Sequence, residues 1–151
     1  MRVYLNTSAL NRPFDDLSRE RVRLEAEAVT LLLAAIERRA VEWVTSEYLV
    51  FEVSRIPDPE RRHRVASFVG LASEALPVSS AVVMRARELE KHGLRGLDSL
   101  HVAAAEAARC DYLVTTDDRM VRRASKAGAA TRVAIVTPMQ AVEALPNERK
   151  R

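Results

Sequence analysis

The chain has 151 residues, a formal net charge of +3, 48% hydrophobic residues and 30% charged residues. This balance predicts one globular domain with a real core and excludes an intrinsically disordered chain. No apolar run approaches the roughly 20 residues that a membrane-spanning helix needs, which excludes a helical membrane protein. The mild positive charge indicates either a polyanionic partner or simply a surface rich in arginine.

Cys110 is the only cysteine. No internal disulfide can form, so a cytoplasmic protein is the simplest expectation, with Cys110 in the core. A strand pattern begins at Val3, and we therefore expect no signal peptide. We expect a single domain over residues 1–146 and a disordered polar tail over residues 147–151.

Strands and helices alternate along the predicted chain. We expect strands at residues 3–5, 41–45, 112–115 and 133–136, and a very short one at Val78. We expect helices from between Asp15 and Ser18 to about Arg39, from 47 to about 55 with Ser46 as its cap, over 59–76, over 81–93, from about Asp98 onward, and over 119–128. Gly93 and Gly128 stand where they can end two of these helices. The strands are continuous apolar runs, which predicts a three-layer α/β fold with a central parallel sheet.

Polar residues follow two of the predicted strands. Asn6 comes directly after the first, and Asp117 directly after the strand that ends near Thr115. Ligands of open parallel sheets bind at the carboxyl ends of the strands, so both side chains are expected at one edge. Asp98 begins a helix, where it is either an ordinary cap or a third member of this group.

Glu52 lies beside the apolar stripe of its predicted helix, where an unpartnered carboxylate is costly. It either pairs with Arg55 or points toward the other acids. Clustered carboxylates repel one another unless a cation neutralises them, and an oxygen ligand set suits Mg²⁺ or Mn²⁺. Such an ion can activate water and stabilise the leaving oxygen of a phosphodiester, which is nuclease chemistry.

Other candidate sites are weaker. His101 fits a hydrogen-bonded helix residue better than a metal ligand, and His63 and His92 lie in charged stretches, so zinc is unsupported. The chain has four glycines and no phosphate-binding glycine loop. Several basic residues either contact a nucleic-acid backbone or are simply solvated: Arg12, Arg119, Arg122, Arg123 and Lys126.

Four segments, VYLNTSALNRPFDD, SEYLVFEVSRI, LRGLDSLHVAAAEA and YLVTTDDRMVRRA, resemble in order the motifs of PIN-domain ribonucleases. The closest likeness is to VapC-like toxins of type II toxin–antitoxin systems, and it covers Val3 to about Ala144. The resemblance implies a three-layer PIN-like fold that hydrolyses RNA with Mg²⁺ or Mn²⁺. It also implies a cognate antitoxin, whose tail lies near the acidic site, and a homodimer.

Motif matching implies that Asn6, Glu52, Asp98 and Asp117 hold the metal and carry catalysis. Asp118 is an alternate for Asp117, and Ser8 and Thr115 match small hydroxyl positions that support the acids. The family pattern has Asp where this chain has Asn6.

An amide keeps one carbonyl oxygen but loses the negative charge, so Asn6 is expected to weaken metal binding and catalysis while leaving the fold intact. Asn6 is either natural, in a degenerate member, or a deliberate substitution, which the otherwise intact motifs favour. The alternative function is a non-catalytic module that binds RNA or an antitoxin. A phosphoacceptor receiver domain would want a lysine after the last strand, where Thr137 stands instead.

Overall fold

A computed structural model describes residues 1–147, and residues 148–151 of the predicted polar tail lie outside the described residues. Five parallel strands form one sheet in the order β3-β2-β1-β4-β5. The strands are β1 (Arg2–Leu5), β2 (Glu42–Ser46), β3 (Glu74–Leu76), β4 (Tyr112–Val114) and β5 (Ala134–Val136). The predicted α/β fold with a central parallel sheet is confirmed.

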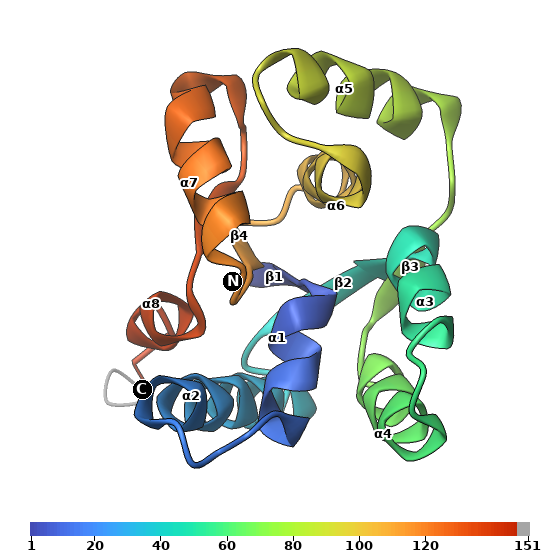
Figure 1. The fold of residues 1–151 in the computed structure, drawn as a ribbon. Coiled ribbons are helices and arrows are strands. Elements are labelled where there is room, and N and C mark those ends of the chain that lie inside the picture. Colours follow the sequence, from blue (N-terminus) through green and yellow to red (C-terminus); the bar gives the residue numbers. More distant parts are fainter. Residues whose placement is uncertain (148–151) are drawn as a thin grey trace.

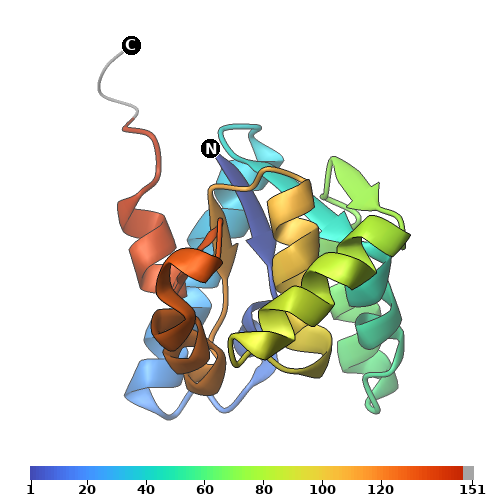
Figure 2. The same cartoon turned by 90° about the horizontal axis from the view of Figure 1, so that it is seen from above.

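Helices cover both faces of the sheet, which completes the three layers (Figure 1). The α-helices are α1 (Thr7–Asn11), α2 (Glu20–Glu37), α3 (Glu47–Ser54), α4 (Pro59–Val69), α5 (Ser80–Lys91), α6 (Gly96–Ala107), α7 (Asp118–Ala127) and α8 (Pro138–Glu143). Two short 3₁₀ helices, η1 (Arg12–Phe14) and η2 (Gly128–Ala130), join them. One face carries α2 and α8 in mutual contact, and the other carries α6, with α5 against its outer side (Figure 2).

The central strand is the most buried part of the molecule. Val3, Tyr4 and Leu5 have no exposed surface, and neither does Trp43 on the neighbouring strand. Burial of each such side chain contributes roughly 1.5–3 kcal/mol to folding before entropy is subtracted. Within residues 1–147, no helix combines the length and apolar character needed to cross a bilayer.

The predicted helix over 59–76 was wrong in its second half. The helix ends at Val69, and Glu74–Leu76 form edge strand β3, so the expected strand at Val78 was also wrong. The Ser73 backbone N–H donates to the Trp43 carbonyl at 2.9 Å, which starts pairing with β2. An edge strand with one solvated side lacks a continuous apolar run, and a helical pattern therefore appeared to continue through it.

The start of the long helix was also predicted too early. Residues 15–19 form a connection, and α2 begins at Glu20 after the unpredicted short elements α1 and η1. The predicted helix ends are confirmed, because Gly93 (φ 104°) and Gly128 (φ 53°) adopt left-handed conformations beyond α5 and α7. Ser46 caps α3 as expected, accepting the Leu49 N–H.

The order of the strands places a topological switch between β1 and β4. From β1 the chain proceeds to β2 and β3 on one side, then returns through α5 and α6 to β4 and β5 on the other. Ligands of open α/β sheets bind at such a point, beyond the carboxyl ends of the strands. Asn6 follows β1 and Asp117 follows β4 closely, so both lie at this switch point.

Candidate active site

Asn6 joins the end of β1 to the start of α1. Its backbone N–H donates to the Val114 carbonyl at 2.9 Å, and its side-chain Oδ1 accepts the Thr7 N–H at 2.7 Å as the cap of the helix. The side-chain Nδ2 lies 3.2 Å from both Thr115 Oγ1 and Met120 Sδ. The amide is only 5% exposed and is therefore held at both ends.

Thr115 and Ser8 connect the two strand ends. Thr115 Oγ1 accepts the Asp117 N–H at 3.1 Å and lies 3.1 Å from Ser8 Oγ, which in turn accepts the Thr116 N–H. Asp117 Oδ1 accepts the Arg119 N–H at the start of α7. Asn6 and Asp117 thus share Thr115 as a neighbour. The supporting role that the resemblance implies for Ser8 and Thr115 stays a prediction.

Glu52 points from α3 toward α1 and α6, and not toward Arg55. Its Oε1 accepts hydrogen bonds from Thr7 Oγ1 and from His101 Nε2, the latter at 3.3 Å. Burial alone would raise the pKa of Glu52, but these two hydrogen bonds outweigh it and hold the pKa below its ordinary value. Glu52 is therefore an ionised carboxylate whose Oε2 makes no hydrogen bond within residues 1–147.

Asp98 lies in the first turn of α6 but is not its cap, a position that Arg95 occupies. Its half-buried carboxylate makes no side-chain hydrogen bond to the described part of the chain. Burial raises the pKa of Asp98, and the charge of Asp117 raises it further, with a smaller contribution from Glu52. The Asp98 carboxylate is therefore affected by the negative charges of Asp117 and Glu52 and, in the opposite direction, by Arg123.

Among residues 1–147, no three His, Cys, Asp or Glu side chains are arranged tightly enough to hold one metal ion. Asn6 stands beside Thr115 at the switch point, so position 6 offers an amide oxygen and no carboxylate. Mg²⁺ keeps several waters and is commonly bound through one or two carboxylates. The unpartnered Asp98 and the partly free Asp117 fit a hydrated ion of this kind.

Asp118, the alternate for Asp117, faces away from this group. Both of its oxygens accept hydrogen bonds from Arg21 on α2, at 2.5 and 2.9 Å, and this contact lowers the pKa of Asp118. Arg12 is likewise engaged, 3.0 Å from Asp15 and 3.5 Å from the buried Glu25. The other basic candidates have exposed or half-exposed side chains on α7: Arg119, Arg122, Arg123 and Lys126.

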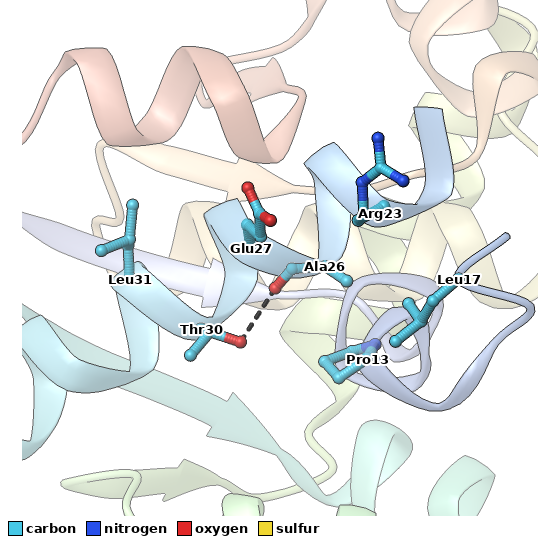
Figure 3. A pocket seen from close by; sticks show the side chains of 7 residues that line it. All are labelled: Pro13, Leu17, Arg23, Ala26, Glu27, Thr30 and Leu31. Carbon is cyan, nitrogen blue, oxygen red and sulfur yellow. Dashed lines mark hydrogen bonds between the residues drawn. The ribbon is translucent and has the colours of Figure 1, made fainter. Parts of the chain in front are cut away.

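A separate hollow of about 650 Å³ lies between η1 and α2 and shares no residue with the acidic group (Figure 3). Its walls include Leu17 and Leu31, which are 44% and 54% exposed. Arg23 and Glu27 stand at the same hollow and give it charges of both signs.

A family model described as PIN domain matches residues 3–126 of the chain. The chain belongs to the PIN domain family. This membership confirms the resemblance inferred from the four motifs.

Curated relatives extend the match over most of the chain. Ribonuclease VapC35 from Mycobacterium tuberculosis, in strains CDC 1551 and H37Rv, is 29% identical over 146 residues, covering 92% of this chain and 98% of the relative. Two solved structures share the fold. VapBC2 from Rickettsia felis, bound to a DNA fragment from their promoter, matches with a TM-score of 0.58 at 16% identity, over 91% of this chain and 98% of that one. PAE2754 from Pyrobaculum aerophilum matches with a TM-score of 0.57 at 15% identity, over 95% and 88%.

Sequence reasoning missed Thr7 and Tyr4 as parts of this region. Thr7 binds Glu52, 45 positions away, and Tyr4 binds His101, 97 positions away. A single sequence carries no signal for such pairs, apart from the position of Thr7 directly beside Asn6. The interpretation of His101 as a hydrogen-bonded helix residue agrees with its two partners, and Cys110 is buried in the core, which raises the pKa of its thiol to about 12.

Proposed function

We propose that the protein is a metal-dependent endoribonuclease of the toxin–antitoxin type, weakened in this chain by Asn6. The observation that supports this most is the half-buried carboxylate of Asp98, which lacks a hydrogen-bond partner in residues 1–147 and is coupled to Asp117 and Glu52. A folded protein rarely leaves a carboxylate in that position unless a cation or substrate compensates it. Membership of the PIN domain family and similarity to a ribonuclease support the same reaction.

Asp98 and Asp117 would hold Mg²⁺ or Mn²⁺, with Asn6 and Glu52 completing the site directly or through water. A divalent ion bound there would supply a Lewis acid for the phosphoryl oxygen and lower the pKa of a bound water. Glu52, with Oε1 fixed and Oε2 unbonded, would accept a hydrogen bond from that water and orient it. Ser8 and Thr115 would hold Asn6 and Asp117 at fixed positions relative to each other.

The substrate backbone would lie along α7. Arg119, Arg122 and Lys126 follow one another at helical spacing from Asp117, and all three are exposed. Arg123 is close enough to Asp98 to lower its pKa, opposing the larger effects of burial and Asp117. Arginine and lysine contacts to phosphates supply affinity without sequence preference, which suits an RNA strand crossing the acidic site.

We also propose a cognate antitoxin as partner, a homodimeric state and a cytoplasmic location. The structural neighbour solved as VapBC2 supports a partner protein. The apolar hollow beside Leu17 and Leu31 offers the kind of surface that an amphipathic helix buries.

A paired cleavage assay tests the reaction. The present chain and its Asn6→Asp variant are incubated with structured RNA in Mg²⁺, in Mn²⁺ and in chelator, beside Asn147→Asp as a control for net charge. We expect cleavage to rise at least tenfold in Asn6→Asp alone, to vanish in chelator, and to be lost again in Asn6→Asp combined with Asp98→Asn. Equal inactivity of Asn6→Asp and the present chain, with RNA bound and metal present, would contradict the proposal.

The second candidate is a non-catalytic module that binds RNA or an antitoxin. The hydrogen bonds at both ends of the Asn6 amide favour it, because they show that the chain accommodates an amide without a metal. In that case Asn6→Asp gains no cleavage and Asp98→Asn has no further effect, whereas charge reversal at Arg122 and Arg123 still weakens RNA binding.

A further inference from the structure

An exposed aromatic side chain lies on α3, directly before Glu52 in the sequence. The chain contains three phenylalanines, three tyrosines and one tryptophan, all of them within residues 1–147. Among these, only Phe51 is largely exposed, at 57%, whereas the others are buried or half-buried. A single exposed apolar residue is ordinary on a protein surface, so the neighbours of Phe51 decide what it can bind.

Arg55 stands over the Phe51 ring. Its Cζ lies 5.8 Å from the ring centroid, which is within the range of a cation–π contact. Arg55 is exposed and makes no ion pair or side-chain hydrogen bond within residues 1–147. Its guanidinium is therefore held beside an aromatic ring, and its N–H donors remain available to an acceptor from outside.

Phe51 and Arg55 lie next to the candidate active site. Residues three and four apart are neighbours on a helix surface, so Arg55 lies between Phe51 and Glu52 on α3. Helix α3 contacts both α1 and α6, the helices that carry Thr7 and Asp98. Figure 1 shows α3 on one side of α1 and α6, and α7 with its basic residues on the other. A strand that crosses the acidic residues from α7 therefore reaches Arg55 and Phe51 next.

The chemistry of these two side chains fits a nucleotide. The face of an unpaired base stacks on an aromatic ring, and a guanidinium donates to phosphate oxygens. The net charge of +3 and the basic residues of α7 favour a polyanion over a protein partner. A protein partner would also need a continuous apolar surface, but Val50, the other exposed apolar residue of α3, lies nearly opposite Glu52 on the helix.

We propose that Phe51 and Arg55 form a nucleotide-binding surface, on which an unpaired base of the substrate RNA stacks on Phe51 while the adjoining phosphate binds Arg55. This inference rests on the proposed function. It adds the class of substrate, a single-stranded segment of RNA, and the path of that strand from α7 across the acidic residues to α3.

The test measures RNA binding by fluorescence anisotropy in chelator, where metal-dependent cleavage cannot occur. The probes are a fluorescein-labelled oligoadenylate and an abasic RNA with the same backbone, so they differ only in their bases. Phe51→Leu keeps an apolar side chain without an aromatic face, Phe51→Trp keeps an aromatic face, and Arg55→Gln removes the charge. The matched control is Val50→Ala, which removes exposed apolar surface from another side of α3.

We expect the present chain to bind oligoadenylate more tightly than the abasic RNA. Phe51→Leu should weaken oligoadenylate binding about tenfold and leave abasic binding unchanged, whereas Phe51→Trp should retain the difference between the probes. Arg55→Gln should weaken binding of both probes and reduce the slope of log affinity against log salt concentration by about 0.7, as for one phosphate contact to a single strand. Val50→Ala should change neither affinity, and circular dichroism verifies that every variant is folded.

The inference would be overturned by equal affinity for the two probes, by a loss in Phe51→Leu that is the same for both, or by no binding of either. A shift of Phe51→Leu from dimer to monomer in analytical ultracentrifugation, with RNA binding unchanged, would assign the surface to a second copy of the chain and overturn it as well. The cleavage assay decides the proposed function separately. Base-dependent binding with an inactive Asn6→Asp variant would refute the nuclease and leave the nucleotide-binding surface, whereas cleavage with base-independent binding would refute the surface alone.

Discussion

Asn6→Asp is the substitution whose effect on metal binding can be worked out most directly. It exchanges an amide for a carboxylate of nearly the same size at the switch point of the sheet, beside Thr115 and in the group that contains Asp117. At roughly 4 Å and an effective dielectric constant near 20, one pair of unit charges interacts by about 4 kcal/mol. If desolvation and repulsion offset about two-thirds of this energy, roughly 1.4 kcal/mol remains, which corresponds to a tenfold gain in affinity.

The environment of Asn6 allows this exchange without a change of fold. The Thr7 N–H can donate to a carboxylate oxygen as it does to the amide oxygen, and the Thr115 hydroxyl can turn from acceptor to donor. The cost arises without metal, because the new carboxylate stands at a site that is only 5% exposed and beside Thr115, which also bonds Asp117. The metal-free variant should therefore melt at or below the temperature of the present chain.

Calorimetric titration with Mg²⁺ and Mn²⁺, together with thermal melts at several metal concentrations, measures both effects. We expect at least tenfold tighter binding and a larger metal-dependent rise in melting temperature for Asn6→Asp than for the present chain. Asn147→Asp, exposed near the end of the described residues, controls for net charge. The reasoning would be refuted if metal affinity did not change, or if the metal-free variant were markedly more stable, which would indicate that residue 6 belongs to a structural network.

Two further predictions concern charged residues away from the proposed metal site. Burial raises the pKa of Glu25 in the folded protein despite the nearby Arg12 and Arg21. The neutral Glu25 side chain therefore stabilises the fold fully below the pKa that Glu25 has in the unfolded chain, and this stabilisation is lost as pH rises through the pKa of the folded protein. As pH rises from about 4 to 7, the free energy of unfolding of Glu25→Gln should therefore increase relative to that of the present chain, as measured by urea unfolding. A difference between the two proteins that does not change with pH would contradict the raised pKa of Glu25. Arg122→Glu combined with Arg123→Glu should weaken RNA binding, and the slope of log affinity against log salt concentration should fall by about one unit per lost phosphate contact. The control Arg87→Glu on α5 should change neither quantity. Fluorescence anisotropy at several salt concentrations measures both.

The parts of the fold that the sequence predicts are those in which local pattern and burial agree. The apolar runs of β1, β2 and β4 are buried on both faces, and the residues that end α5 and α7 adopt the conformations that glycine favours. The edge strand β3 fails this test because it contains exposed Glu74 and Ala75 and is fixed mainly by its pairing with β2. The short helix α1 was not predicted for a similar reason, since its cap Asn6 is held by residues more than 100 positions away.

The residues of the candidate site also differ in how far the sequence predicts their positions. The strand-end rule alone brings Asn6 and Asp117 to one edge, while the places of Glu52 and Asp98 come from the family resemblance. The roles of all four remain predictions. The partner of Asp118 could not be found from sequence, because Arg21 lies 97 positions away and competes with the local possibility that Asp118 joins the acids. Long-range pairs of this kind depend on side-chain geometry that no spacing in the chain records.

Asn6 separates two tasks that an aspartate would perform together at this position. A small polar side chain is enough for the cap of α1 and for the contact with Thr115, and the Asn6 amide provides both. The link to β4 needs only the backbone N–H of residue 6. The negative charge contributes nothing to those contacts and opposes folding when no cation is present. A chain with Asn at this position should therefore fold as its relatives do while losing affinity for the ion. For the same reason, Asn6→Asp should be no more stable than the present chain without metal, whereas with metal both its stability and its activity should rise.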